Sequence, residues 1–261
     1  MNILITGARS NIGYSLAKSL ALKGHIVYAG CKTIQEKETL EDRINSEKII
    51  IFPIVLNLLE KDFDIIDSLD LDCIVLHASI SNGGSVLEIS NDRFNEVIDV
   101  NIKGNFRLLQ KYIRYCYYKN KPGRVFLTSS LAAFFPLPYL SSYTSSKLYL
   151  ISLANSLKLE LLYQGLNISI SLIMPGAYYT GFNDLMIDNK SKDKYILKNK
   201  GINITKYQKI IFSILEKVDY DDLIKTVIKE IEKPNPKFII SRPISQKIFT
   251  KIYILIKTLI V

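Results

Sequence analysis

Short apolar runs alternate with longer segments of helical periodicity along most of the chain. The apolar runs carry isoleucine, valine and leucine at consecutive positions, as do strands that are buried on both faces. They predict seven strands, at residues 2–5, 26–29, 49–55, 73–77, 124–128, 169–173 and 237–241. The segments between them predict helices, among them residues 12–23, 91–119, 143–164 and 221–233. This alternation indicates an α/β fold, a Rossmann-type doubly wound parallel sheet of about seven strands in three αβα layers.

One stretch departs from this alternation. Residues 178–218 are rich in lysine and contain no clear strand. A long insertion inside a compact domain usually binds or covers a ligand. We therefore expect a substrate lid there, within a single catalytic domain at residues 1–241 that is followed by a tail at 242–261.

The composition excludes several classes of protein. With 48% hydrophobic and 23% charged residues, the 261-residue chain is neither disordered nor fibrous. Three scattered cysteines and two histidines argue against a disulfide framework and a histidine-rich metal centre, so we expect no metal. The chain opens without a basic stretch ahead of an apolar one, and no uncharged apolar run reaches about 18 residues. We therefore expect a cytoplasmic protein without a regular membrane span.

The charge balance is basic, with 34 lysines and arginines against 25 acidic residues and a net charge of +9. Such a balance is found in proteins that bind nucleic acids or anionic membranes. No arginine-rich run or nucleic-acid-binding motif accompanies it. We therefore expect no nucleic-acid partner and assign the excess mainly to a lysine-rich surface.

A glycine-rich turn, TGARSNIG at residues 6–13, follows the first predicted strand and leads into a helix. Such a turn lets the backbone approach a pyrophosphate, whose negative charge is then received by the amides and dipole of the helix N-terminus. Read by itself the turn could be an ordinary tight connection. Its place directly after the first strand favours dinucleotide binding.

A second set of residues carries acid–base chemistry. Tyr143 and Lys147 are four positions apart at the start of a predicted helix, so they share one helix face. An ammonium beside a phenol favours the phenolate and lowers the pKa of the tyrosine. Ser130 lies just after a buried strand, and Asn101 lies inside a helical pattern that asparagine disfavours. The sequence MPGAYYT at residues 174–180 follows the sixth strand at the sheet edge where ligands bind.

Together these motifs resemble the classical short-chain dehydrogenase/reductase family, in order and spacing from residue 6 to about 241. The resemblance implies an oxidoreductase that transfers a hydride between a nicotinamide dinucleotide and a carbonyl or alcohol carbon. It implies that Tyr143 is the catalytic acid/base and that Ser130 binds the carbonyl. It further implies that Lys147 holds the ribose and lowers the pKa of Tyr143, and that Asn101 holds a proton-relay water.

The resemblance also implies which residues contact the cofactor, with Pro175, Gly176 and Thr180 on the nicotinamide side. The full set expected at the dinucleotide is Gly7, Arg9, Ser10, Asn11, Ile12, Gly13, Lys32, Asn57, Ala78, Tyr143, Lys147, Pro175, Gly176 and Thr180.

Three positions depart from the family pattern. Asn11 replaces the middle glycine of the turn, and asparagine is the residue that next best adopts a left-handed conformation. His77 precedes Ala78 where the family has asparagines, and we interpret it as a structural substitute. Asn57 stands in place of an acidic residue beside the adenine and can still form a hydrogen bond with it.

The charges at the end of the second strand favour NADP(H) over NAD(H). NAD-binding relatives place an acidic residue there to bind the ribose hydroxyls. Here the edge reads AGCK at residues 29–32, without an acid. Lys32 and Arg9 are cations that could meet a 2′-phosphate, although both could also be ordinary surface charges.

The function that follows is an NADP(H)-dependent interconversion of a carbonyl and an alcohol on a small molecule. Apolar residues around the expected pocket indicate an apolar or acyl-type substrate: Phe134, Tyr178, Tyr179, Phe182 and Met186. Two alternatives stay open, a non-catalytic dinucleotide-binding scaffold on this fold and a family member that modifies sugar nucleotides.

Two further segments bear on partners. The helices expected at 101–118 and 143–164 carry more apolar residues than one sheet face needs. Relatives pair such helices across a twofold axis, so we expect a homodimer or homotetramer. In the tail, a helical projection separates the lysines from a wide apolar face, as in helices that lie on anionic membranes. Packing on the domain or on another subunit is the alternative, and the β-branched isoleucines leave a strand open.

Overall fold

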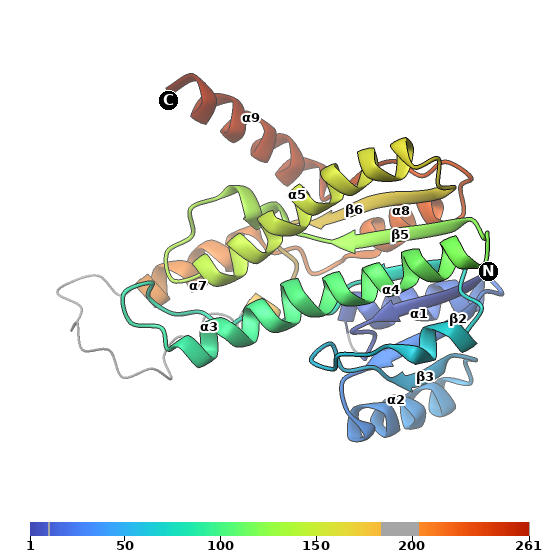
Figure 1. Cartoon of the computed structure of the whole chain (residues 1–261). Coiled ribbons are helices and arrows are strands. Elements are labelled where there is room, and N and C mark those ends of the chain that lie inside the picture. The colour runs from blue at the N-terminus through green and yellow to red at the C-terminus, as the bar shows by residue number, and fades with distance from the viewer. Residues whose placement is uncertain (10, 184–203, 261) are drawn as a thin grey trace.

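Seven parallel strands form one sheet in the computed structural model, which describes residues 1–9, 11–183 and 204–260. The strands are β1 (Asn2–Thr6), β2 (Ile26–Cys31), β3 (Phe52–Val55), β4 (Cys73–Leu76), β5 (Gly123–Thr128), β6 (Ile168–Pro175) and β7 (Ile239–Arg242). Their order across the sheet is β3-β2-β1-β4-β5-β6-β7, and every neighbouring pair is parallel. Helices cover both faces of this sheet (Figure 1). The expected doubly wound, three-layer fold is therefore confirmed.

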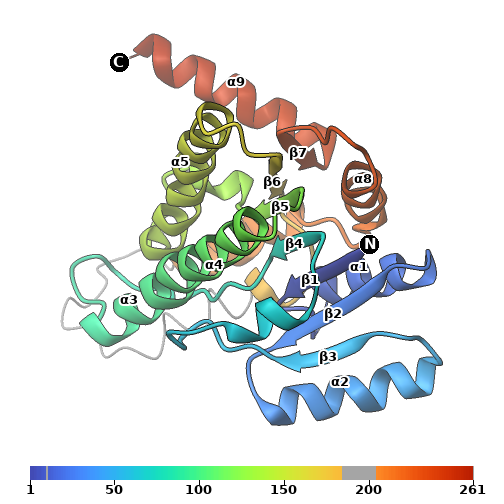
Figure 2. The same cartoon turned by 45° about the vertical axis from the view of Figure 1, so that its right-hand side comes forward.

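The helices are α1 (Asn11–Leu22), α2 (Ile34–Glu47), α3 (Asn91–Val97), α4 (Asn105–Tyr118), α5 (Ser141–Tyr163), α7 (Ile204–Leu215), α8 (Asp221–Ile231) and α9 (Ile244–Ile260), with short 3₁₀ turns η1 (Asp64–Ser68) and η3 (Leu131–Phe134). Figure 2 shows α1 and α8 on one face of the sheet and α4 and α5 on the other. The core divides in the same way, because successive side chains of a strand point to opposite faces. In β1, Ile3 and Ile5 join the core under α1 and α8, whereas Leu4 joins the core under α4 and α5.

The long helix expected at residues 91–119 contains an interruption. Between α3 and α4 the backbone forms a π-helical stretch, η2 (Ile98–Gly104), which contains Asn101. Such stretches insert an extra residue into a helix and are frequent at functional sites. Gly104 lies here against the backbone of Leu58, so a larger residue would displace that loop.

The expected lid at residues 178–218 and the tail at 242–261 both contain helices. Within 178–218 the structure describes α7 and an isolated parallel bridge between Tyr178 and Lys217; residues 184–203, which include Met186, lie outside the described residues. The tail forms the helix α9 rather than a strand. Within the described ranges, no helix is both long and apolar enough to cross a membrane.

Candidate active site

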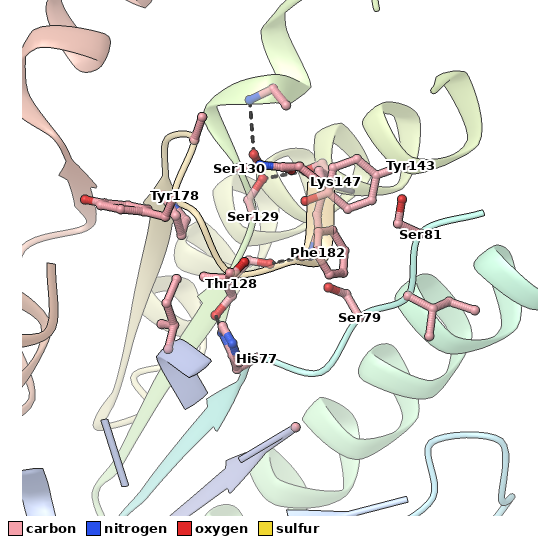
Figure 3. Close-up of a pocket in the computed structure, with 18 of the residues that line it drawn as sticks. His77, Ser79, Ser81, Thr128, Ser129, Ser130, Tyr143, Lys147, Tyr178 and Phe182 are labelled. Atoms are coloured by element: carbon pink, nitrogen blue, oxygen red, sulfur yellow. Dashed lines mark hydrogen bonds between the residues drawn. The ribbon is translucent and has the colours of Figure 1, made fainter. Parts of the chain in front are cut away.

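The carboxyl ends of the strands open into a cavity of about 1040 Å³. Its walls come from the turn after β1, from the loops after β2 to β6, and from α5, α7 and α9. Binding at this edge is the general rule for open parallel sheets, because the loops there diverge around a crevice. Figure 3 shows the part of the cavity that holds Ser130, Tyr143 and Lys147.

The glycine-rich turn is locked against the loop that follows β4. Thr6 Oγ1 accepts hydrogen bonds from the backbone N–H groups of His77 and Ala78, both at 3.0 Å. Gly7 has a φ of 67°, and a Cβ on it would lie 2.8 Å from the Cα of Ala78. Asn11 takes the left-handed conformation expected of it, with a φ of 53°.

This turn forms the end of the cavity that fits a pyrophosphate. Gly7, Arg9, Asn11 and Ile12 line the cavity where α1 begins. Gly13 does not line it but lets the turn close, since a Cβ there would lie 3.1 Å from Cδ2 of His77. Ser10 lies outside the described residues. The backbone amides of a helix N-terminus and the absence of a side chain on Gly7 suit a phosphate group.

His77 lines the cavity and lies below Thr128 and Ser129 in the view of Figure 3. Its Nδ1 is 3.4 Å from Oγ1 of Thr128. Burial, together with the positive charge of Lys147, lowers the pKa of His77 to about 4. The ring is therefore neutral at physiological pH, and it fills the space between the turn and β5 as the structural reading of this position expects.

Lys147 is buried on the inner face of α5, with 2% of its surface exposed. Its Nζ donates a hydrogen bond of 3.0 Å to the carbonyl of Thr128 at the end of β5. The Oγ of Ser129 donates to the carbonyl of Lys147 at 2.8 Å, which ties α5 to the same strand end. Burial lowers the pKa of Lys147 to about 7, because the ammonium has lost its water.

Tyr143 lies one helical turn before Lys147, and Nζ of Lys147 is 5.6 Å from the centroid of the phenol ring. Burial raises the pKa of Tyr143 to about 12, while a hydrogen bond with Ser130 acts in the opposite direction. Burial thus outweighs the lowering of this pKa that was expected from the ammonium of Lys147. The physical reason is that removing the phenol from water costs the phenolate more than its neighbours return.

Ser130 follows β5 and begins η3, where its Oγ accepts a hydrogen bond of 3.1 Å from the backbone N–H of Ala132. The same hydroxyl shares a hydrogen bond with Tyr143. Ser130 Oγ acts as acceptor in this backbone hydrogen bond, so its O–H can donate toward the cavity or toward Tyr143. Ser130 and Tyr143 thus face one point in the cavity (Figure 3).

Asn101 is fully buried and does not line the cavity. Its Oδ1 accepts from the backbone N–H of Ile80 at 2.9 Å, and its Nδ2 donates to the carbonyl of Ile80 at 2.9 Å and to Oγ of Ser146 at 3.0 Å. Both edges of the amide are therefore occupied. The side chain thus ties the loop after β4, where Ile80 lines the cavity, to Ser146 of α5.

The far end of the cavity is charged and includes a residue that the sequence reading missed. Arg9, Lys32 and Asn57 line it as expected, together with Glu36 from the first turn of α2. Oε1 of Glu36 is 3.6 Å from Nε of Arg9, and Oε2 accepts from the backbone N–H of Lys32 at 2.8 Å. Glu36 in turn donates its backbone N–H to Oγ1 of Thr33 at 3.2 Å. Thr33 is thus the N-cap of α2, while the carboxylate of Glu36 reaches the residue before the cap; the T-x-x-E spacing is a signal visible in the sequence.

The opposite wall comes from the loop after β6, where Pro175, Gly176 and Thr180 line the cavity. The tail helix supports this loop, since Oε1 of Gln246 accepts a hydrogen bond of 2.8 Å from the backbone N–H of Ala177. Gln246 was not expected at the site, because the sequence reading treated the tail as a separate segment.

The residues expected to bind substrate are only partly brought together. Phe182 lies over Tyr143, with ring centroids 5.6 Å apart. Tyr178 reaches the cavity, but its ring points away from Tyr143 (Figure 3) and packs edge-on to Tyr220 at 6.3 Å. Tyr179 is instead 60% exposed and does not line the cavity; its backbone N–H donates to the carbonyl of Lys217 at 3.0 Å, beside the bridge that Tyr178 forms with Lys217.

Phe134 is also not where it was expected. It lies at the end of η3 and packs on the core under α4 and α5, and it is its neighbour Phe135 that lines the cavity. The apolar wall is completed by residues of α7, which lie within the expected lid at 178–218, and by one residue of α9, which was not assigned to the site: Ile211, Phe212, Ile214, Leu215 and Phe249.

The sequence is similar to those of known short chain dehydrogenases and reductases. The profile of short chain dehydrogenases matches residues 1–191 of the chain. Human mitochondrial dehydrogenase/reductase SDR family member 2 is 28% identical over 196 residues, covering 72% of this chain and 69% of that protein. A 3-oxoacyl-(acyl-carrier-protein) reductase of Rickettsia bellii is 28% identical over 191 residues, covering 72% of this chain and 77% of the reductase.

Solved structures share the fold at lower identity. A short chain dehydrogenase/reductase from Burkholderia phymatum in complex with NAD superposes with a TM-score of 0.74 at 16% identity, covering 96% of this chain and 92% of the other. A variant of actinorhodin polyketide ketoreductase with NADPH superposes with a TM-score of 0.73 at 17% identity, covering 92% of this chain and 94% of the other.

Proposed function

The chain belongs to the short chain dehydrogenase family, oxidoreductases that act on carbonyl or alcohol groups with a nicotinamide dinucleotide, and from this premise we propose its specific reaction. It interconverts the carbonyl and alcohol forms of an apolar or acyl-type substrate with NADP(H), using Tyr143 as the acid/base. One observation carries this proposal: Tyr143, Ser130 and Lys147 line a single cavity that extends to the glycine-rich turn.

The residues present fit a dinucleotide along the whole cavity. The side-chain-free turn at Gly7 and the N-terminus of α1 suit the pyrophosphate, and Ala78 closes the wall beside it. Lys147 lines the cavity where it would hold the nicotinamide ribose. Pro175 and Gly176, from the loop after β6, line the same cavity. When bound there, the cofactor supplies or accepts the hydride.

Tyr143 moves the proton in this scheme. With its pKa raised to about 12 by burial, the phenol carries its proton at neutral pH, which is the state that can donate to a forming alkoxide. Ser130 donates a hydrogen bond to the same oxygen and so stabilises the charge that develops on it. In the reverse direction Tyr143 must first lose its proton, and the charge of Lys147 favours that loss.

NADP(H) is favoured by the charges at the adenosine end. Arg9 and Lys32 line the cavity there against one carboxylate, that of Glu36. Two cations and one anion leave a positive excess, which attracts a 2′-phosphate. We infer that Glu36 moderates this preference, since it is bonded to the backbone of Lys32 and lies 3.6 Å from Arg9.

The substrate class is inferred from the wall opposite the turn. Phe135, Phe182, Phe212, Leu215 and Phe249 surround the space in front of Tyr143 with apolar surface. Similarity to 3-oxoacyl-(acyl-carrier-protein) reductases supports an acyl-type substrate. We propose that residues 178–218 act as the lid, since Phe182 covers Tyr143 and Asn183 is bonded to Glu216 at 2.6 Å across this segment.

We also propose a homodimer or homotetramer through α4 and α5. Several apolar side chains of α5 are exposed in the single chain, among them Leu148 at 47%, Leu159 at 50% and Leu162 at 72%. Apolar surface of this kind on a long helix marks a contact between subunits. Sedimentation at micromolar concentration tests this, and a monomer would contradict it.

The reaction is tested by the oxidation of NADPH with a panel of carbonyl compounds. We expect turnover with 3-oxoacyl thioesters and apolar ketones, a lower rate with NADH, and no turnover with sugar nucleotides. Tight binding of NADPH without oxidation by any member of the panel would support a non-catalytic scaffold instead. Turnover confined to sugar nucleotides would contradict the apolar substrate.

A further inference from the structure

The tail helix α9 presents an apolar face that nothing in the described chain covers fully. Seven of its side chains are between 50% and 77% exposed: Ile244, Ile248, Phe249, Ile252, Leu255, Ile256 and Leu259. At 100° per residue these positions fall within a sector of roughly 140°. A sector of this width is broader than the narrow seam of a coiled coil and is typical of a helix that lies on an apolar surface.

The other side of α9 is anchored to the body of the protein. Thr250 is 3% exposed, and Nε2 of Gln246 donates a hydrogen bond of 2.7 Å to the carbonyl of Leu215. The ring of Tyr253 packs on Phe135 with centroids 4.7 Å apart. These contacts fix the rotation of the helix about its axis. Phe249, at one edge of the apolar sector, lines the cavity and stacks on Phe135 with ring centroids 5.9 Å apart, whereas none of the other six apolar side chains of the sector lines the cavity.

Figures 1 and 2 show that α9 extends past the edge of the body and that the C-terminus lies at an extremity. The helix follows β7, which is the edge strand of the sheet. The exposed face is therefore accessible to a large, flat partner without displacement of another element drawn in these views.

The charge on α9 has one sign. The helix contains Lys247, Lys251 and Lys257 and no acidic residue. In the helical projection the lysines lie beside or opposite the apolar sector, where their long side chains can reach along the helix while the apolar residues are buried. The whole chain, α9 included, has a net charge of +9.

We propose that α9 docks the protein on an anionic lipid bilayer, lying in the plane of the headgroups with its apolar face in the acyl region. Lipid phosphates would supply the counter-charge that α9 lacks. Pairing of α9 with a second copy would bring two sets of lysines together with no acid on either helix, which Coulomb repulsion disfavours. A transmembrane orientation does not fit, because no described helix is long and apolar enough to span a bilayer.

The proposal is tested with the full-length protein and two kinds of vesicle, phosphatidylcholine alone and phosphatidylcholine with phosphatidylglycerol. We expect co-sedimentation with the anionic vesicles to be at least tenfold stronger, and to weaken as salt is raised. The assay requires no turnover, so its outcome is separate from that of the proposed reaction. A protein that stays in solution with both kinds of vesicle would overturn the proposal.

Two pairs of variants separate the apolar and the charged contributions. Ile252→Asn with Leu255→Asn removes part of the apolar face, and Lys247→Glu with Lys251→Glu reverses two charges. Each should reduce binding to anionic vesicles tenfold or more. The matched controls are Leu22→Asn with Ile50→Asn, which are 68% and 77% exposed elsewhere, and Lys225→Glu with Lys229→Glu on α8. The controls should bind less than twofold more weakly.

Retained NADPH binding shows that each variant is folded. If the asparagine variant binds the vesicles as well as the wild type, the apolar face does not contact lipid and the proposal is wrong. If the same variant instead changes the sedimentation coefficient in the absence of vesicles, a second copy covers this face, and the proposal is again overturned.

Discussion

The two ends of the cavity use charge in opposite ways. At the catalytic end Tyr143 and Lys147 are 8% and 2% exposed, and burial moves the pKa of each away from its ordinary value. At the adenosine end the side chain of Arg9 is 53% exposed, and its ion pair with Glu36 is loose at 3.6 Å. In the proposed function, the buried end holds the groups that transfer the proton, and the exposed end distinguishes NADP(H) from NAD(H), which differ by one phosphate.

The contrast predicts how mutations at the two ends should differ. A buried charge is little screened by salt. Substitutions at the buried end, which holds Tyr143 and Lys147, should therefore change turnover by large factors that do not depend on salt. Exposed ion pairs contribute only about 0–1 kcal/mol and are screened. Changes at the adenosine end should therefore alter selectivity by small factors that shrink as salt is raised.

The largest effect among these is expected from Lys147→Met. Turnover should fall about 100-fold or more, the scale of general acid–base catalysis, because the charge that supports Tyr143 is lost. The melting temperature should hold or rise, since the buried amine is costly to the fold. Steady-state kinetics and thermal melting measure both, with Lys158→Met on the same helix as the control. A large loss of stability would show that Lys147 holds the fold together rather than the reaction.

The buried amine of Lys147 should also make the stability of the folded chain depend on pH. The pKa of Lys147 is about 7 in the folded chain and near its ordinary value, about 10.5, in the unfolded one. Between those values the unfolded chain binds more protons, so stability should rise with pH. The wild type should therefore gain stability from pH 7 to pH 10 relative to Lys147→Met. An equal change in both proteins would mean that the amine is not desolvated.

Next in size is Gly7→Ala, for which Gly165→Ala provides a matched control. Both glycines have a positive φ, 67° and 63°, but only a Cβ on Gly7 meets another atom, the Cα of Ala78 at 2.8 Å. Both variants should lose about 1–2 kcal/mol of stability from the backbone conformation. Only Gly7→Ala should also weaken NADPH binding, by tenfold or more in calorimetric titration. Equal NADPH binding by the two variants would remove this turn from the cofactor site.

A smaller effect is expected from Glu36→Gln at the adenosine end. Glutamine keeps an acceptor for the backbone N–H of Lys32 but releases Arg9 from its ion pair. The ratio of kcat/KM for NADPH to that for NADH should rise about three- to fivefold at low salt, and by less at high salt. Glu38→Gln, on the same helix but outside the cavity wall, is the control. A ratio that falls would mean that Glu36 assists binding of the phosphate.

The smallest effect on activity is expected from His77→Asn, with turnover within about threefold of the wild type, because the neutral ring only packs beside Thr128. The substitution should change the pH dependence of stability more than it changes turnover. The pKa of His77 is about 4 in the folded chain, below its ordinary value, so the wild type loses stability as pH falls below about 6.5. Between pH 7 and pH 5 this loss should reach up to about 2 kcal/mol and be absent in His77→Asn. Denaturant unfolding at the two pH values measures it.

Much of the fold could be predicted from the sequence because strands buried on both faces leave an unambiguous apolar pattern. All seven strands and the parallel topology followed from it. The interruption at Ile98–Gly104 did not, because a π-helical stretch has the same composition as the helix around it. The start of β3 was placed three residues too early, since apolar residues precede the first paired one, Phe52.

At the site, prediction was best where a residue's role depends on its own strand or helix. Tyr143 and Lys147 share a helix face by their spacing, and Ser130 directly follows a strand, so the resemblance to the family could be transferred to these residues one by one. Prediction failed where residues distant in sequence meet: Gln246 under the loop after β6 is an example. It also failed for Phe134 and Tyr179, because the direction of a side chain in an irregular segment depends on a backbone that the sequence pattern does not define.

The measurement that tests the central claim most directly is Tyr143→Phe, assayed for NADPH binding and for turnover on one preparation. The variant keeps the ring, and with it the contact with Phe182, and removes only the hydroxyl. Affinity for NADPH should stay within about threefold, while turnover of a 3-oxoacyl thioester falls roughly 10²–10⁴-fold, the contribution of a general acid. A variant that retains more than about a tenth of the wild-type turnover would contradict the assignment of Tyr143 as the proton donor.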